Sequence, residues 1–356
     1  MQDTARRAFI AALVVGGVLV LGLALWKLRL LLALIILAVT IAAAMRPGVE
    51  ALKRRGVPRG VGVGLHYLGL VGLLALLIYF VVPTAIDQIQ EAVPTSQSEL
   101  RAQARESSGI KQRVLLSVQQ RLEDLPSAER IAERAVDPAL EIGVRAFEIL
   151  IFVFFTFASA AYWIFERDRA VGLVTGMLPG PKRKTVRDTW DLIDLKLGAY
   201  VRGQLLLMTL VAIVLSFAFW AIGLPFWLLI GVFAGIVEIV PVLGPLIAGT
   251  LAVGVGLTVS WGLGLAAGLV VLGVRLLEDY LVIPRVLGDA VGLTPLTVLV
   301  AVLATTILFG GFAVLLAIPL AAMAATLIDV LLRHRDPAEE DVPTVIFPAR
   351  DAEAAE

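Results

Sequence analysis

Charged side chains occur where the sequence is otherwise almost continuously apolar. The stretch 204–283 contains Glu238, Arg275, Glu278 and Asp279 among long runs of aliphatic residues. An ionised side chain within hydrocarbon costs about 2.5 kcal/mol or more, so such residues usually face a protein interior or a water-filled cavity. A carboxylate in that position can carry a proton or bind a cation. These four residues are therefore the first candidates for an ion or solute pathway.

Glu238 stands beside residues that should interrupt a helix. It lies three residues before Pro241, and Gly244 and Pro245 follow. A proline lacks the backbone N–H, so each one frees a carbonyl about four residues upstream. A broken helix with free carbonyls near a carboxylate is a common way for secondary transporters to form an ion site. The alternative is a proline kink in which Glu238 pairs with Arg275 or bonds a backbone group.

Arg275, Glu278 and Asp279 have i, i+3, i+4 spacing, so the three side chains share one helix face. Two interpretations stay open for this cluster. It is either a self-neutralising group near the outer membrane interface or the lining of an extracellular gate.

The elements that position these residues must be membrane helices. Of 356 residues, 59% are apolar and 17% are charged, whereas a soluble domain has about 45–50% apolar and about 25% charged residues. A crossing helix needs about 20 apolar residues. We therefore predict an all-α integral membrane protein in contact with the lipid bilayer, with about eight transmembrane helices at 8–26, 30–45, 61–82, 146–165, 204–223, 226–259, 262–283 and 296–330.

Two of these stretches, 226–259 and 296–330, are too long for one straight crossing, and each has Gly or Pro near its middle. Each is either one long broken helix or a pair of short arms. If both stretches were re-entrant, the chain would cross the membrane six times, and if both crossed twice, it would cross ten times. We prefer eight crossings.

Lys and Arg cluster in 46–59 and in 166–202, and Arg333 and Arg335 follow the last span. The positive-inside rule then places both termini in the cytoplasm of a cell-membrane protein. We expect five parts. They are N-terminal membrane helices (1–83), an extracytoplasmic helical insertion (84–145), a fourth membrane helix with an amphipathic cytoplasmic segment (146–203), a C-terminal membrane core (204–335) and a disordered acidic tail (336–356). Within the insertion, helix breaks are expected at Pro94, Gly109, Pro126 and Pro138.

Several function classes are excluded or disfavoured. Thirty basic residues balance thirty acidic ones, so net charge does not indicate a nucleic-acid partner. The absence of Cys and the presence of only two His exclude disulfides, thiol catalysis and multi-histidine metal sites. The segment 176–185 lacks the spacing of a phosphate loop. We expect no enzyme activity, no cofactor and no bound metal.

Three Gly-x-x-x-Gly pairs offer places where helices could approach closely, at Gly60/Gly64, Gly231/Gly235 and Gly264/Gly268.

The order of these features resembles the autoinducer-2 exporter family of bacterial and archaeal membrane proteins. The resemblance covers roughly residues 5–335 and is most specific in the C-terminal half. The segments that carry it are 197–204 (LGAYVRGQ), 223–225 (GLP), 238–245 (EIVPVLGP), 278–288 (EDYLVIPRVLG), 292–295 (GLTP), 309–311 (FGG) and 318–322 (IPLAA).

The resemblance implies about eight spans, an outer insertion after the third span, homo-oligomers, and secondary or passive transport. Members have been linked to export of autoinducer-2 and to sodium(lithium)/proton antiport. Many members have Asn where this chain has Glu238. A carboxylate at that position favours a cation or proton role.

The resulting hypothesis is a transporter gated around the break at 238–245, in which Glu238 exchanges a proton against a monovalent cation or couples the proton to export of a small solute. Arg202 and Gln204 would lie at the cytoplasmic mouth, and the Arg275 cluster at the outer one. The alternatives are uncoupled export of a small polar signalling molecule and, from another class, a membrane scaffold.

Overall fold

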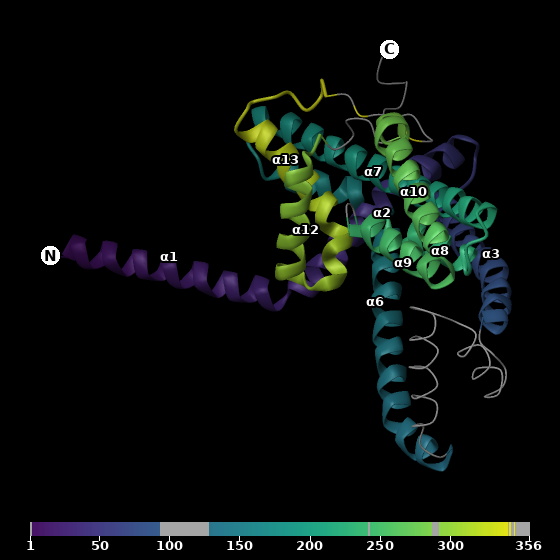
Figure 1. The fold of residues 1–356 in the computed structure, drawn as a ribbon. Helices are drawn as coiled ribbons and strands as arrows, with labels where there is room; N and C mark the ends of the chain where they lie inside the picture. Colours follow the sequence, from purple (N-terminus) through teal and green to yellow (C-terminus); the bar gives the residue numbers. More distant parts are fainter. Residues whose placement is uncertain are drawn as a thin grey trace.

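The computed structural model describes residues 2–92, 128–240, 243–286, 292–340, 342 and 345, and the described part of the chain is helical, without a strand. This confirms the predicted all-α membrane fold (Figure 1). The elements are α1 Gln2–Lys27, α2 Arg29–Arg54, α3 Arg59–Ala92, α6 Ala128–Gly176, α7 Gly180–Ala221, α8 Trp227–Val237, α9 Leu243–Val259, α10 Trp261–Leu277, the π-helical η1 Glu278–Val282, α11 Ile283–Val286, α12 Pro295–Phe309, the 3₁₀-helical η2 Gly311–Leu316 and α13 Ala317–Leu331.

Within the described ranges, six helical segments are long and apolar enough to cross a membrane. They are Phe9–Lys27, Arg29–Arg54, Arg59–Gln88, Gly143–Gly176, Gly180–Ala221 and Gly311–Leu331. Helices α8, α9 and α12 are apolar but shorter, with 11, 17 and 15 residues. At a rise of about 1.5 Å per residue, even α9 is only about 25 Å long. None of the three would cross about 30 Å of hydrocarbon along a straight normal path.

Both long apolar stretches are divided into pairs of helices. The first consists of α8 and α9, with α8 ending at Val237 and α9 beginning at Leu243. The second changes direction at Gly310, whose φ of 97° lies in the left-handed region that favours glycine. Helix α9 packs beside α10, and α12 packs beside η2 and α13 (Figure 1). The first stretch is thus a pair of short helices, whereas the second is the short helix α12 followed by the segment Gly311–Leu331, which is long enough to cross.

Helix α7 is the central element, because it packs against α2, α6, α8, α10 and α13. Its C-terminal half forms one apolar core with α8, α9 and α10, around Phe219 and Ala252. A second core joins α2, α3 and α6, around Val49 and Ala160. Helix α1 extends away from both cores (Figure 1), and most of its described apolar side chains are exposed, as expected for a helix surrounded by lipid.

Two predicted helix breaks are wrong. The third span was expected to end at Pro83, but α3 continues through it to Ala92. Likewise, α6 includes Pro138. A proline removes one main-chain hydrogen bond and bends a helix, and the uninterrupted turns on either side are sufficient to continue it. The other predicted breaks, Pro94, Gly109 and Pro126, lie outside the described residues.

Two of the three glycine pairs lie in close helix contacts. A Cβ on Gly231 would overlap the main chain of Ser216 in α7, and one on Gly235 would overlap Ala212 of the same helix. In the hairpin of α9 and α10, a Cβ on Gly256 would lie 2.8 Å from the Cα of Gly264. The Gly60/Gly64 pair makes no such approach. Small residues therefore set the spacing of the α7–α8 and α9–α10 pairs.

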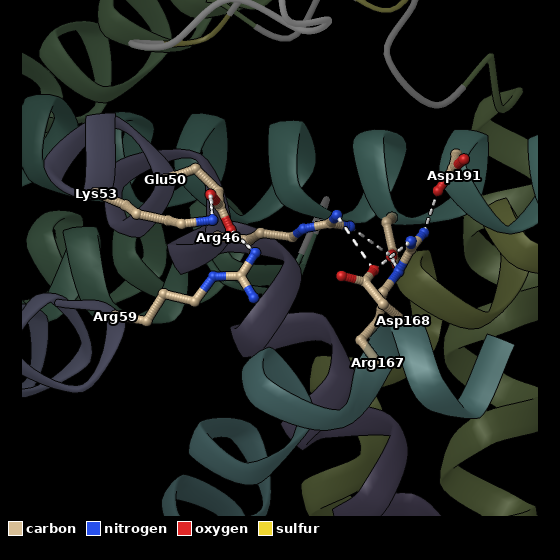
Figure 2. Close-up of polar contacts among 8 residues, drawn as sticks. Arg46, Glu50, Lys53, Arg59, Arg167, Asp168 and Asp191 are labelled. Atoms are coloured by element: carbon tan, nitrogen blue, oxygen red, sulfur yellow. Dashed lines mark hydrogen bonds and ion pairs between the residues drawn. The ribbon is translucent and has the colours of Figure 1, made fainter. Parts of the chain in front are cut away.

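An ion-pair network centred on two buried residues, Arg167 and Asp194, joins α2, α6 and α7 (Figure 2). Arg167 of α6 binds Asp194 of α7 at 2.8 Å, and it also binds Asp191 and Asp168. Arg46 of α2 reaches the same oxygen of Asp194 at 3.5 Å. Arg167 and Asp194 are both buried, with 6% and 7% of their surface exposed. Because Asp194 is buried, its charge depends on these two arginines.

We predict that Gly231→Ala destabilises the protein by about 1–3 kcal/mol, because the added methyl group forces α8 away from α7. Gly254→Ala is the matched control, since a Cβ there meets no atom within 4 Å. The control should be neutral or stabilising by about 0.5–1 kcal/mol. Thermal unfolding in detergent, followed by circular dichroism, measures both. An equal effect of the two substitutions would contradict the close α7–α8 contact.

We predict that Arg167→Met costs about 3–5 kcal/mol, because Asp194 would keep a buried charge without its nearest counterion. Arg169→Met, two residues along α6 at an exposed position, should change stability by less than about 0.5 kcal/mol. Adding Asp194→Asn to Arg167→Met should recover much of the loss, since the unpaired charge is then removed. Unfolding by titration with a denaturing detergent tests all three, and failure of the double variant to recover would argue against this electrostatic cause.

Candidate functional site

The candidate site lies where α8 ends. Glu238 is the residue that follows α8, and it is buried with 5% of its surface exposed. Its main-chain carbonyl accepts a hydrogen bond of 2.9 Å from Nε2 of Gln204 in α7. A side-chain amide thus supplies a donor at the helix end, which is how a break inside lipid is tolerated.

The structure describes two of the three predicted helix-breaking residues after Glu238. Pro241 lies outside the described residues. Gly244 and Pro245 lie in the first turn of α9, where the missing N–H of a proline leaves no helical bond unmade. A Cβ on Gly244 would overlap the carbonyl of Val237. Glycine at this position therefore allows the start of α9 to fold back closely against the end of α8.

Arg275 of α10 is the centre of the site. Its Nη1 lies 3.2 Å from Oε1 of Glu238 and 3.1 Å from Oε2 of Glu278. Its Nη2 lies 3.0 Å from Oδ1 of Asp279. The predicted sharing of one helix face by Arg275, Glu278 and Asp279 is confirmed by these distances. The predicted ion pair between Glu238 and Arg275 is also present in the structure.

A π-helical turn arranges the acidic side of the site. It covers Glu278–Val282, directly after α10. Single π turns inside α-helices are rare and often occur at functional sites. Glu278 is buried with 3% of its surface exposed, whereas the side chain of Asp279 is 41% exposed. The two adjacent carboxylates therefore have different surroundings although they share one guanidinium.

The charges in this site do not balance. One guanidinium faces three carboxylates, and two of the three are buried. Moreover, the C-terminal end of α8 carries the negative end of its helix dipole. When all groups are ionised, the site has surplus negative charge that a proton or a monovalent cation would reduce. Among the described residues, no group of three or more His, Asp or Glu is arranged to hold a metal ion.

Gln204 and Arg275 contact different groups of the same residue. Gln204 was expected at the cytoplasmic mouth and the Arg275 cluster at the outer one, and these roles stay predictions. In the structure both contact Glu238, Gln204 at its carbonyl and Arg275 at its carboxylate. The sequence could not show this, because residues 204, 238 and 275 come together only where α8 and α10 pack on α7.

Arg202 lies two residues before Gln204 but faces another side of α7. It is buried, and it donates hydrogen bonds to the carbonyl of Ala44 in α2 and to the carbonyl of Val345. Val345 belongs to the acidic tail, which was predicted to be disordered. In the structure, Val345 packs on Ala199 with 3% of its surface exposed.

Sequence reasoning missed three buried charged residues, Arg167, Asp194 and Lys196. The only local signal was the i, i+3 spacing of Asp191 and Asp194 in a segment that otherwise looks amphipathic. Lys196 binds the hydroxyl of Thr326 in α13 at 3.3 Å and the carboxylate of Glu340 at 2.6 Å.

Comparison with known proteins shows the family of this chain. The family model described as "AI-2E family transporter" matches residues 10–333. YrrI of Bacillus subtilis (strain 168) is 24% identical over 313 residues, which cover 85% of this chain and 86% of the relative. MT0215 of Mycobacterium tuberculosis (strain CDC 1551 / Oshkosh) is 26% identical over 352 residues, which cover 93% of this chain and 91% of the relative. Both carry the name "Putative transport protein". This chain is a multi-pass helical membrane protein, and the family model matches nearly its whole length. It therefore belongs to the AI-2E transporter family.

Proposed function

We propose that the protein is a secondary transporter in which Glu238 exchanges a proton against a monovalent cation, or couples that proton to the export of a small solute. The observation that carries this proposal is a buried carboxylate at a helix break that shares its only described cationic partner, Arg275, with two further carboxylates. Membership of a transporter family and the apolar helices support the same conclusion.

The arrangement suits a site with two states of charge. With Glu238 ionised, Arg275 is shared among three carboxylates, and the surplus charge attracts a cation. With Glu238 protonated, the guanidinium pairs with Glu278 and Asp279 alone, which lie 3.1 and 3.0 Å from it in the structure. Binding of a proton and binding of a cation are then alternatives at one carboxylate, which is the requirement for exchange.

The break supplies the mechanical part of the proposal. Helix α8 ends at Val237 and α9 begins at Leu243, so the two arms are separate helices. A ligand can shift an equilibrium between two conformations only by binding them differently. Glu238 lies at the junction of the two arms. Its ion pair with Arg275 depends on its protonation state, so protonation changes a contact at this junction.

A second candidate is uncoupled export of a small polar signalling molecule such as autoinducer-2, favoured by the name of the matching family. In this case Glu238 is a structural counterion that neutralises Arg275, as the ion pair of 3.2 Å allows.

The deciding measurement is dye-reported proton flux in proteoliposomes with an imposed pH gradient. Addition of sodium, lithium or potassium to the wild type should collapse the gradient, and Glu238→Gln should reduce that cation-dependent rate at least tenfold, because an amide cannot release a proton. The Gln204 bond should persist in this variant, since it is made to the main-chain carbonyl of residue 238.

Glu148→Gln is the control, because Glu148 is a half-exposed carboxylate of α6 whose partner is Arg145. It should transport at the wild-type rate. If correctly inserted wild-type protein shows no cation-dependent flux, antiport is excluded. If flux is present and Glu238→Gln leaves it unchanged, Glu238 is structural and the second candidate gains.

A further inference from the structure

Helix α8 runs back along α7 in the opposite direction. A Cβ on Gly231 would overlap Ser216 of α7. Further along α8, the carbonyl of Glu238 accepts a hydrogen bond from Gln204, which comes earlier in α7. The candidate site therefore lies beside Gln204, at the end of α8 that faces the first residue of the apolar part of α7.

Helices α9 and α10 form a hairpin whose two open ends meet at this site. Helix α9 begins at Leu243, a few residues after Glu238, and Arg275 in the last turn of α10 pairs with Glu238 at 3.2 Å. The hairpin turns at Ser260, between the two helices. Each arm has 17 residues, which corresponds to about 25 Å. The turn is therefore far from the site along the hairpin.

The hairpin extends along the apolar part of α7, and α8, α9 and α10 lie side by side (Figure 1). One apolar core contains Phe219 from the last turns of α7, Ala252 of α9 and Ala267 of α10. Leu224, from the turn between α7 and α8, belongs to this core, and Leu263, from the first turn of α10, packs against it. The turn of the hairpin therefore points toward the end of α7, which is opposite to the site.

Charged residues are concentrated at the site end of these helices. The stretch 205–274 contains one charged residue, Glu238, so the turns at the opposite end carry no charge. The site end carries Arg202, Arg275 and Arg285. Because Lys and Arg are enriched on the cytoplasmic side of membrane proteins, this distribution assigns the site end to the cytoplasm and the hairpin turn to the outer side.

Asp279 is the carboxylate of the site that water can reach. Its side chain is 41% exposed, whereas Glu238 and Glu278 are buried. An exposed carboxylate within hydrocarbon is costly, so Asp279 should lie at the water-facing edge of the site. The neighbouring Tyr280 is 77% exposed, and tyrosine is enriched at membrane interfaces. The guanidinium of Arg275 then joins this edge to the buried Glu238, with distances of 3.0 and 3.2 Å.

We propose that the candidate site is loaded from the cytoplasmic side, that Asp279 is its entry carboxylate, and that the α9–α10 hairpin separates it from the outer face. This assignment differs from the sequence-based expectation, which put the Arg275 cluster at the outer mouth. The inference rests on the proposed function for the identity of the ion, a proton or a monovalent cation. The side from which the site is reached is tested without transport.

The first test is the labelling of single cysteines, because the chain has no Cys of its own. Asp279→Cys reports access to the site, and Gly262→Cys reports the hairpin turn, where a Cβ meets no atom within 4 Å. Lys184→Cys, at an exposed position near the start of α7, is the reference for the cytoplasmic face. A membrane-impermeant maleimide is applied to right-side-out and to inside-out vesicles.

Lys184→Cys and Asp279→Cys should both be labelled at least tenfold faster in inside-out vesicles, and Gly262→Cys at least tenfold faster in right-side-out vesicles. Arg285→Cys, at another exposed position of the site end, should behave like Asp279→Cys and replaces it if that variant does not fold. Labelling of the site end from the face opposite to Lys184→Cys would overturn the proposal. Labelling of Gly262→Cys from the Lys184 face, or from neither face, would overturn the placement of the hairpin, and labelling of Lys184→Cys from outside would overturn the cytoplasmic assignment.

The second test measures the entry role of Asp279 from each side. Asp279→Asn should raise the cation concentration for half-maximal proton flux roughly tenfold when the cation is added to the cytoplasmic face, and less than about twofold when it is added to the outer face. Glu148→Gln, at the half-exposed carboxylate of α6, should change neither value. An equal rise on both faces would overturn the entry role. If the wild type shows no flux, the proposed antiport fails, and the labelling test still decides from which side the site is reached.

Discussion

Hydrocarbon offers no hydrogen-bond partner, so a polar group buried in a membrane helix needs a partner from the protein itself. Helix α7 meets most of this requirement. Four of its buried residues make these contacts. Asp194 bonds to α6 and α2, Lys196 to α13 and Glu340, Arg202 to α2 and Val345, and Gln204 to the end of α8. The apolar contacts along α7 are non-directional and would tolerate sliding. The polar contacts fix the neighbouring helices in register around it.

The same constraint explains why two ion-pair networks of similar composition have different consequences. In the network around Arg167, two arginines face three aspartates, but the side chains of Asp168 and Asp191 are 63% and 45% exposed and can be solvated. In the network around Arg275, one arginine faces three carboxylates, of which Glu238 and Glu278 are buried. Surplus charge costs little where water reaches it and much where water does not. In the second network, a bound proton or cation would reduce surplus charge on carboxylates of which two are buried.

Much of this could be predicted from sequence because it depends on local composition. Apolar content indicated the all-α membrane fold, and rare charges in apolar sequence identified Glu238 and the Arg275 cluster. The contact between Gln204 and Glu238 could not be predicted. It depends on the close packing of α8 on α7, which the glycines of α8 allow. The helix through Pro83 was missed because a local rule was outweighed by its flanking turns. The contact of Val345 with Ala199 was missed because two valines, Val342 and Val345, stand in an acidic segment.

Glycine contacts divide the C-terminal core into two pairs of helices. Helix α8 is held on α7 at Gly231 and Gly235, and α9 is held on α10 at Gly256 and Gly264. The break after Val237 is the covalent connection between the pairs. Glu238 adds a polar connection, because its carbonyl is bound by Gln204 of the first pair and its carboxylate by Arg275 of the second. Protonation of Glu238 would leave the first bond intact and weaken the second, so a proton acts directly on the link between two otherwise tightly packed units.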